Sequence, residues 1–383
     1  MSMPVLPDEQ LLATAHAFAR DVIAPAAEAW QDAGSVPRTY FQQAAQAGLT
    51  GLLVPCGEGG RGLGVTAYTA VLGVLAKHCM AATFALVVHN NLAASIARHG
   101  SAVHKARYLS AMLAGDAVGA FLLTEPDVGS DAQAITTHAT RAPQGWTLNG
   151  AKAWISNATL ADVLCVYAQT DPGTGSRGIA CFLVDADHPG VSRTPPYALL
   201  GGHALGTGGF EFTDCRLEHS ALLHAPGAAF RAALEGIDVA RLAVAAMCCG
   251  MLECAVDVAL AHGTERRAFG QTIGDFQGVQ WLLADCATEL AAARALTAHA
   301  TAAADNGENV TLLAAQAKKF ASQIAFARIA TCMQVMGAAG LGRDYPLARH
   351  LAAAKIAQYL DGATEVQNVV IARALRVAHL SKR

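Results

Sequence analysis

The residue best suited to acid–base chemistry in this chain is Asp361, near the C-terminus. It stands in the run Tyr359–Glu365 at the end of a strongly helical stretch, where Leu360, Gly362 and Ala363 offer nothing that would stabilise a charge. An apolar pocket without water penalises the ionised form and raises the pKa of a carboxyl from about 4 towards neutrality. Such a carboxylate can remove a proton from carbon. An Asp-Gly pair after a helix is also a common C-cap and turn, and the run alone does not decide between the two.

Two upstream segments carry side chains that suit a flat, hydrogen-bonding cofactor. Residues 122–131 read Leu-Leu-Thr-Glu-Pro-Asp-Val-Gly-Ser-Asp, and residues 149–157 read Asn-Gly-Ala-Lys-Ala-Trp-Ile-Ser-Asn. A flavin ring needs hydrogen-bond partners at its pyrimidine edge and at N5, together with an apolar or aromatic wall. Thr124 and Ser156 offer hydroxyl groups, and Trp154 offers the wall. The pattern therefore favours a flavin site beside the base.

A phosphate contact is predicted at the end of the first segment. Gly129 lets the chain approach a phosphate without a side chain, and Ser130 adds a hydroxyl there. The alternative is a surface turn over 127–131 followed by an ordinary hairpin. The glycines of 57–64 follow no strand and precede no Gly-Lys-Ser/Thr, so we expect a connector there and not a phosphate loop.

The composition narrows the class of protein. The 383 residues are 53% hydrophobic and 15% charged, which predicts two or three domains with large buried surfaces, including subunit contacts. The net charge is −3 without a basic stripe, so nucleic acid is not expected as a partner. Ten scattered cysteines without Cys-x-x-Cys or His-x-x-x-His spacing predict buried thiols and no metal site.

The sequence also predicts a cytoplasmic protein without a membrane partner. Asp8 and Glu9 occupy the start of the chain, where a secretory signal would carry a basic and then an apolar segment. The longest uncharged apolar run, Leu242–Leu252, is too short to cross a bilayer.

The chain divides into three parts by texture. Residues 1–119 are helical, residues 120–225 carry short β-like runs between Pro, Gly and Asn turns, and residues 226–383 return to long helices. The β part predicts a small antiparallel barrel or sandwich, and the last part an antiparallel four-helix bundle. A cleft is expected where the three parts meet. The expected long elements are helices 9–30, 38–48, 68–77, 82–99, 103–114, 230–268, 281–305, 312–336 and 349–358, and strands 146–148, 163–168, 179–184 and 210–212.

This order and these segments resemble the acyl-CoA dehydrogenase family, essentially from end to end. Residues 122–131 are similar to the family's Thr-Glu-Pro-x-x-Gly-Ser-Asp signature, and residues 149–157 to Asn-Gly-x-Lys-x-Trp-Ile-Thr/Ser-Asn. The resemblance implies an α+β fold and FAD-dependent α,β-dehydrogenation of an acyl-CoA thioester. It further implies an electron-transfer flavoprotein as electron acceptor, and a homotetramer or dimer.

The resemblance also implies roles for single residues of the flavin site. Thr124 would meet the pyrimidine edge, Ser156 would meet N5, and backbone groups of Phe121 and Leu123 would meet the ring. The expected cofactor contacts are Phe121, Leu123, Thr124, Gly129, Ser130, Trp154, Ile155, Ser156, Arg266, Phe269, Gln277, Gln334, Gly337 and Glu365.

Part of that set lies in the bundle. Residues 265–270, followed by Gln277, are similar to the family's Glu-Arg-x-x-Phe-Gly…Gln segment, whose Arg and Phe reach the pyrophosphate and adenine of a neighbouring subunit's FAD. Residues 334–340 are similar to its Gln-x-x-Gly-Gly-x-Gly turn, which also crosses to the other subunit. A solvated charge at Arg266 and a helix C-cap at Gly337 are the alternatives.

Substrate contacts are expected from the base region and the bundle. Asp238 and Arg241 fit an Asp-x-x-Arg segment that lines the thioester channel in the family, although a helix-surface ion pair explains the spacing equally well. Ser130 and Gly362 complete the expected substrate set.

The base is the main departure from the family pattern. Most members have Glu where this chain has Asp361, which is shorter by one methylene, and a misplacement of that size can cost about a hundredfold in rate. Other members carry the base at the position of Ala240, which cannot serve. We therefore expect Asp361 to take the α-proton while flavin N5 takes the β-hydride. Family relatives with Asp at this position act on cyclic acyl-CoAs or on nitroalkanes.

Other departures keep alternative functions open. Ala363 replaces the usual Thr, Ala352 and Ala353 replace an Arg-Asp pair, and residues 201–207 lack the Arg of the family's Leu-Gly-x-Arg-x-Ser stretch. The first alternative keeps the fold with altered chemistry, namely nitroalkane oxidation, desulfination or oxidation of a carrier-protein-bound acyl group. The second is a non-catalytic flavin-binding homologue. The acyl group itself is expected to be short, branched or cyclic.

Overall fold

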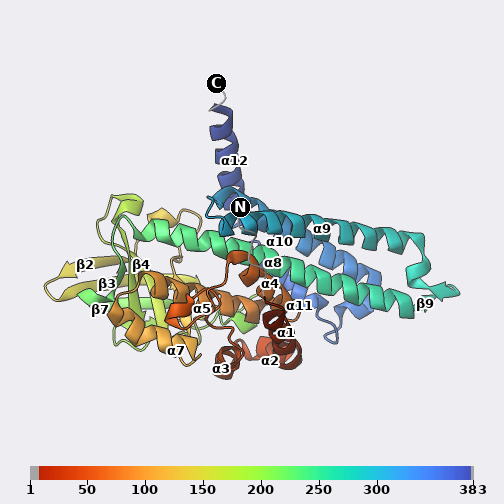
Figure 1. Ribbon diagram of the computed structural model, residues 1–383, viewed down its shortest axis with the longest axis horizontal. Coiled ribbons are helices and arrows are strands. Elements are labelled where there is room, and N and C mark those ends of the chain that lie inside the picture. Colours follow the sequence, from red (N-terminus) through yellow and green to blue (C-terminus); the bar gives the residue numbers. More distant parts are fainter. Residues whose placement is uncertain (1–7, 381–383) are drawn as a thin grey trace.

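Helices build the first part of the chain in the computed structural model, which describes residues 8–380 (Figure 1). The Asp8 side chain caps the first helix by accepting from the Gln10 N–H at 3.1 Å. The predicted helix 9–30 is interrupted by a π-helical turn at Ala19–Ile23, and the glycine-rich stretch 55–64 is the connector expected. The helices are α1 (Glu9–Phe18), α2 (Ala24–Ala33), α3 (Arg38–Gln46), α4 (Val65–Ala76), α5 (Met80–His99), α6 (Ala102–His104) and α7 (Ser110–Leu113).

The middle part is a single curled sheet in the order β6-β7-β3-β2-β4-β5-β8, with β1 paired to β4. Most neighbours are antiparallel as predicted, but β1 and β2 each pair with β4 in parallel, which corrects the expectation of a wholly antiparallel sheet. The expected strand at 146–148 is in fact much longer and carries most of the second motif. The strands are β1 (Gly119–Leu122), β2 (His138–Ala142), β3 (Gly145–Ile155), β4 (Val163–Gln169), β5 (Ile179–Asp185), β6 (Val191–Arg193), β7 (Gly208–Glu218) and β8 (Leu222–His224).

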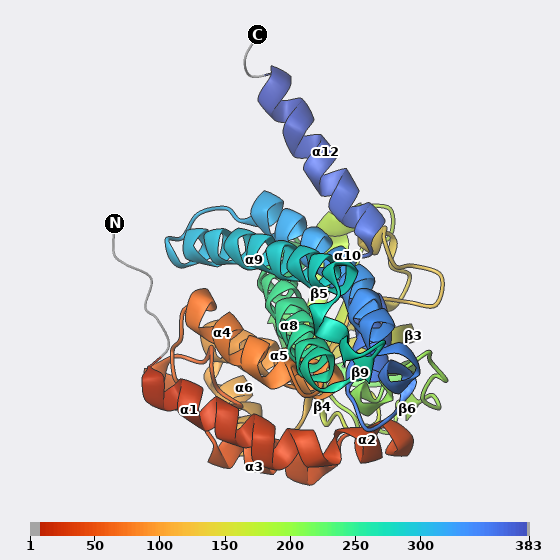
Figure 2. The same cartoon turned by 90° about the vertical axis from the view of Figure 1, so that its right-hand side faces the viewer.

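Long helices form the last part. The 37-residue α8 runs from the β part along the whole bundle, and the β9–β10 hairpin lies at its far end (Figure 1). Helix α8 ends at Glu265, three residues earlier than predicted, because Arg267–Ala268 belong to β9. Helix α12 was not predicted, and it projects away from the body of the molecule (Figures 1 and 2). The elements are α8 (Ala229–Glu265), β9 (Arg267–Ala268), β10 (Gln271–Thr272), α9 (Gln277–Asp305), α10 (Thr311–Met336), α11 (Leu347–Ala357) and α12 (Thr364–Leu380).

Two hydrophobic cores hold these parts. The larger joins the N-terminal helices to the bundle and includes residues from α1, α4, α5, α8 and α10. The smaller lies within the curl of the sheet, where Leu148, Phe182 and Phe210 are fully buried. The outer limits of the expected domains, 1–119 and 226–383, fall partly outside the described residues, and the three-domain division stays a prediction.

Three helical stretches are long and apolar enough to cross a membrane by length and composition, contrary to the expectation from the strictly uncharged run. They are Met80–His99, Ala229–Glu265 and Thr311–Leu341, and their apolar windows are 83%, 72% and 44% buried inside the fold. The first two therefore use most of their apolar surface for packing within the chain.

Close crossing of α4 and α8 brings the N-terminal helices onto the bundle. A Cβ built on Gly250 would overlap the carbonyl oxygen of Gly73, so the two backbones touch where side chains normally separate helices. Residues small enough for this contact are thus required at the crossing.

Gly250→Ala is expected to lower the free energy of unfolding by about 1–3 kcal/mol, because the added methyl forces α4 and α8 apart. Gly236→Ala in the same helix is the matched control, since a Cβ there meets no atom within 4 Å. Gly236→Ala should raise the free energy of unfolding by up to about 1 kcal/mol, because alanine has a higher helix propensity than glycine. Thermal unfolding of the two variants measures the difference; equal melting temperatures would contradict the crossing.

Candidate active site

A buried ion pair joins the two predicted flavin motifs. Lys152 of β3 donates to the Glu125 carboxylate at 2.8 Å and to the Leu123 carbonyl at 2.9 Å, and both charged side chains lie inside the protein. Glu125 also accepts from the backbone N–H groups of Thr136 and Thr137, at 2.7 and 2.9 Å. The segments around residues 124 and 152 are thereby fixed side by side.

The electrostatics of this pair keep both side chains ionised. We call the Glu125–Lys152 pair the clamp. Burial alone would raise the pKa of Glu125, but the Lys152 ammonium and the Thr136 and Thr137 hydrogen bonds outweigh it and hold that pKa at about 2. Burial lowers the pKa of Lys152 to about 8, against the pull of Glu125. At neutral pH Glu125 is therefore charged, and it serves as an anchor and not as a proton carrier.

The clamp presents the expected ring contacts at one edge of the sheet. The Ala153 N–H donates to the Thr124 carbonyl at 3.0 Å, which places Trp154 and Ser156 beside the first motif. Trp154 has a positive φ of 60° and leaves 58% of its surface exposed, and its ring packs on Tyr197 with centroids 4.6 Å apart. A bulky residue held in this costly backbone conformation points to a functional constraint.

The remaining expected contacts of this region differ in burial. Leu123 and Ile155 are buried, Phe121 is half-buried against Tyr167, and Ser130 is exposed. A Cβ built on Gly129 would meet no protein atom within 4 Å, so packing within the chain does not require glycine there. The site is thus able to admit a cofactor phosphate, which is the reason predicted for glycine at this position.

The predicted base lies in a tightly held turn between α11 and α12. Asp361 has a φ of 51°, in the left-handed region that non-glycine residues avoid. Arg241 Nε of α8 donates to the Asp361 carbonyl at 2.9 Å, and Lys318 Nζ of α10 donates to the carbonyls of Gln358 and Gly362, both at 2.8 Å. Gln367 Nε2 donates to the Gly362 carbonyl at 2.9 Å. Three surrounding helices therefore fix this turn through its carbonyl groups.

The Asp361 carboxylate itself is left without a partner. Its Oδ2 atom is buried and has no hydrogen-bond partner in the described part of the chain. Burial raises the pKa of Asp361 to about 6, against the opposing influence of the Lys318 and Arg241 charges. A buried, unpaired carboxyl of raised pKa is the arrangement that a general base needs. Its Oδ2 is also an orphaned buried polar atom, for which a catalytic role is one explanation.

Asp238 and Arg241 form a buried pair that faces the base. Arg241 Nη1 donates to Asp238 at 2.8 Å, Asp238 accepts from the Thr311 hydroxyl at 2.7 Å, and both charged side chains are at least 90% buried. The two residues do form an ion pair, as the alternative expected, but the pair is buried and does not lie on the helix surface. The contact of Arg241 with the Asp361 carbonyl places the pair at the turn, and a role in a thioester channel stays a prediction.

The expected cofactor contacts of the bundle lie away from the β part. Arg266, Phe269 and Gln277 are exposed around the β9–β10 hairpin, at the end of α8 opposite the sheet (Figure 1). Phe269 is 96% exposed. Gln334 and Gly337 line a cavity of about 400 Å³, and Gly337 has a φ of 61°, which suits glycine at the end of α10. Glu365 is exposed in the first turn of α12. Within one chain, the hairpin region with Arg266, Phe269 and Gln277 therefore lies far from the β part that carries Thr124 and Trp154.

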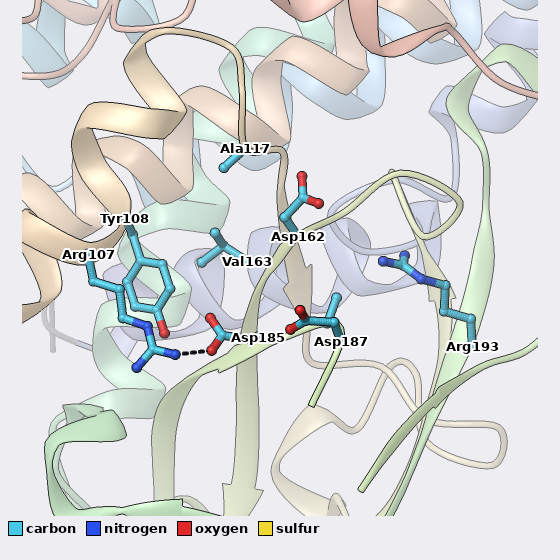
Figure 3. Close-up of a pocket in the computed structure, with 9 residues that line it drawn as sticks. Arg107, Tyr108, Ala117, Asp162, Val163, Asp185, Asp187 and Arg193 are labelled. Atoms are coloured by element: carbon cyan, nitrogen blue, oxygen red, sulfur yellow. Dashed lines mark hydrogen bonds and ion pairs between the residues drawn. The ribbon is translucent and has the colours of Figure 1, made fainter. Parts of the chain in front are cut away.

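A second cavity lies apart from every predicted site residue. It measures about 550 Å³ and is lined by charged groups of the helical part and of the sheet, with an ion pair between Arg107 and Asp185 (Figure 3). Arg38 holds Asp162, at its edge, with a two-pronged contact. These internal ion pairs already compensate much of the charge that faces the cavity.

Sequence reasoning missed Glu125, Lys152, Lys318 and Gln367. Glu125 and Lys152 stood inside the quoted motifs, so a charge in each of two otherwise apolar segments was a signal for a pair. Lys318 sits in the apolar helix stretch 312–326, and a lysine there was a signal for a buried contact. Nothing in the sequence marked Gln367. The described residues contain no cluster of three metal-ligating side chains.

Comparisons with known proteins agree with this fold. The chain matches the descriptions "Acyl-CoA dehydrogenase, N-terminal domain" over residues 7–116, "middle domain" over 120–215 and "C-terminal domain" over 227–376. It is 36% identical to an acryloyl-CoA reductase (NADH) of Anaerotignum propionicum, over 95% of this chain and 93% of that protein.

Two solved structures extend the similarity to three dimensions. Butyryl-CoA dehydrogenase from Megasphaera elsdenii is 32% identical with a TM-score of 0.92, covering 96% of this chain and 97% of the other. A glutaryl-CoA dehydrogenase from Mycobacterium smegmatis in complex with FADH2 is 28% identical with a TM-score of 0.89, covering 96% and 95%.

The chain combines an all-helical part, a β part whose two predicted flavin motifs are joined by the Lys152–Glu125 pair, and a helical bundle with the buried, unpaired Asp361 Oδ2. This combination is that of a flavin-dependent oxidoreductase. The chain belongs to the acyl-CoA dehydrogenase family, and it is an FAD-dependent oxidoreductase of that type. The α+β fold expected from the resemblance is confirmed.

Lys152→Met is expected to lower the free energy of unfolding by about 3–5 kcal/mol, because it leaves the Glu125 carboxylate buried without its cation. Adding Glu125→Gln should recover part of the loss by removing the uncompensated charge. Both effects hold at neutral pH, since the Glu125 contribution is lost only as the pH falls from about 4.5 through about 2. Thermal unfolding is the measurement; a double variant no more stable than Lys152→Met would contradict the clamp.

Proposed function

We propose that this chain dehydrogenates an acyl-CoA thioester between its α and β carbons, with Asp361 taking the α-proton. The observation that carries the proposal is the Asp361 carboxyl, which is buried, unpaired at Oδ2 and raised in pKa to about 6. A carboxylate of that pKa is ionised at neutral pH and is a stronger base than an exposed one.

The chain's own residues prepare this step. Arg241, Lys318 and Gln367 bind the carbonyls of the turn, so the Asp361 side chain projects from a fixed backbone. Tyr68 of α4, which is fully buried, lies close enough to Asp361 to interact with it electrostatically. The Asp361 N–H is proposed to donate to the thioester oxygen, which would increase the acidity of the α-carbon.

The residues present fit FAD. Thr124, Ser156 and the backbone of Phe121 and Leu123 would hold the ring, with Trp154 against it. Gly129 and Ser130 would take a phosphate, because open space faces Gly129. Ile155 and Glu365 complete the proposed contacts on this chain. Bound FAD supplies the hydride acceptor of the reaction.

The cofactor contacts of the bundle are proposed to serve a second copy of the chain. Arg266, Phe269 and Gln277 stand around the β9–β10 hairpin, which lies at the end of α8 remote from the sheet (Figure 1), and Gln334 and Gly337 line a cavity at the end of α10. Phe269 exposes 96% of its surface, so its ring is available to contact a second copy of the chain. A dimer or tetramer would bring both sets to one FAD. We propose an electron-transfer flavoprotein as acceptor; the cytoplasmic location stays a prediction.

The shorter base favours particular substrates. With Asp in place of Glu, the carboxylate reaches less far, so a short, branched or cyclic acyl group that brings its α-carbon closer is proposed. Asp238, Arg241, Ser130 and Gly362 are the proposed substrate contacts. The same substitution is the observation that favours the second candidate, a more acidic carbon such as that of a nitroalkane.

The test of the function is a panel of short, branched and cyclic acyl-CoAs, added anaerobically to the FAD-loaded protein. The proposal expects at least one to bleach the flavin absorbance and to yield the enoyl-CoA. A nitroalkane, a sulfinate and an acyl group on a carrier protein are the comparison arms. If only one of these comparison substrates bleached the flavin, its reaction would take the place of the proposed one. If no compound of either group bleached the flavin, the proposal would be refuted in favour of a non-catalytic role.

Asp361→Asn is expected to lower the bleaching rate by about a thousandfold or more, because the amide cannot accept the α-proton. Asp361→Glu is the matched variant, since it keeps the charge and extends the reach; it should retain activity and shift preference towards straight chains. The wild-type rate should fall as the pH drops through about 6, where Asp361 becomes protonated. Stopped-flow absorbance gives all three results, and full activity in Asp361→Asn would refute the assignment.

A further inference from the structure

Lys318 is a buried cation whose position the proposed reaction does not yet explain. It is fully buried in α10, and no carboxylate in residues 8–380 forms an ion pair with it. Placing an ammonium group inside a protein is costly, and a methionine of similar length would fill the same space without that cost. A lysine at this depth therefore calls for a role that a neutral side chain cannot fill.

The contacts of Lys318 are both on the turn that carries the base. Its Nζ donates to the Gln358 carbonyl before Asp361 and to the Gly362 carbonyl after it, each at 2.8 Å. Gln358 is the last residue before the turn and Gly362 has a φ of 99°. One ammonium group thus links the two ends of the segment that holds Asp361 in its left-handed conformation.

The charge of Lys318 also acts on the carboxylate. Burial raises the pKa of Asp361, and of the two cations that oppose this rise Lys318 has the larger influence, ahead of Arg241. Arg241 already has a direct anionic partner in Asp238, whereas Lys318 has only carbonyl groups. The other groups that face this region are Tyr68 of α4, Cys248 of α8 and Glu365 of α12.

We propose that Lys318 is the positioning residue of the base: its ammonium group fixes the Asp361–Gly362 turn and keeps a positive charge beside the carboxylate. This inference rests on the proposed role of Asp361. The cation acts through the turn and at a distance, so it holds the base in place without an ion pair that would quench its basicity.

The test compares Lys318→Met with Lys319→Met in the FAD-loaded protein. Lys319 is the adjacent residue of α10 and makes no side-chain contact with the turn in the described structure, so the same charge is removed elsewhere on one helix. Lys318→Met should slow flavin bleaching about tenfold or more through misplacement of the base. The apparent pKa of the rate should rise by about one unit, because an opposite charge no longer favours the carboxylate. Lys319→Met should match the wild type in both.

A shift of the pH profile separates positioning from simple packing. A slower Lys318→Met with the wild-type apparent pKa would overturn the proposal, since a packing defect lowers the rate without altering the charge felt by Asp361. If Lys318→Met does not fold or bind FAD, Lys318→Arg keeps the charge with a larger head group. It should keep the wild-type apparent pKa and lose rate; a variant equal to the wild type in rate would overturn the proposal.

A second readout needs no substrate. In a double-mutant cycle by thermal unfolding at pH 7, where burial leaves Lys318 charged with a pKa of about 8 and Asp361 ionised with a pKa of about 6, Asp361→Asn should raise the melting temperature more in Lys318→Met than in the wild type. The reason is that the carboxylate in Lys318→Met has lost its main counter-charge. Equal shifts in the two backgrounds would overturn the inference. Activity retained in Asp361→Asn would instead refute the proposed function, so the two failures are distinguishable.

Discussion

The desolvation of one carboxylate, Asp361, is the constraint on which the site depends. Two carboxylates in motif positions, Glu125 and Asp361, have surroundings that shift their pKa values in opposite directions. Glu125 is paired directly with Lys152 at 2.8 Å and accepts from backbone N–H groups, so its pKa falls to about 2. Asp361 has cations nearby that bind only its backbone or its neighbours, so burial dominates and its pKa rises to about 6. The first is a structural anchor and the second is available for chemistry.

Helix α8 connects these local arrangements to the rest of the molecule. Its N-terminal half carries Asp238 and Arg241 at the base, its middle crosses α4 at Gly250, and its C-terminal end leads into the hairpin with Phe269. A single helix of 37 residues therefore sets the spacing between the proposed base and the cofactor contacts proposed at the hairpin. Since α4 also carries Tyr68, which interacts electrostatically with Asp361, the backbone contact at the crossing fixes Tyr68 relative to α8.

Local patterns predicted the helical first and last parts of the chain, because helical periodicity is a property of short segments. Motif spacing likewise indicated the family, while the roles of Thr124 and Trp154 at the flavin stay predictions. The parallel pairing of β1 with β4 was not, since parallel neighbours are far apart in sequence and leave no turn signal. Helix α12 was missed because it packs little of its surface on the chain. Lys318 and Gln367 were missed because the carbonyls they bind are backbone groups, which carry no sequence signal.

The hydrogen bonds that hold the turn limit how far the Asp361 side chain, which is one methylene shorter than Glu, can reach. Arg241, Lys318 and Gln367 bind the carbonyls of Asp361 and Gly362 from three helices, and Asp361 already has a strained backbone. A turn fixed by so many donors cannot move forward to compensate for a shorter side chain without breaking buried hydrogen bonds. Under the proposed function, the substrate and not the turn must therefore supply the missing reach. The rigidity of this turn is the physical reason for proposing a branched or cyclic acyl group in place of a longer base.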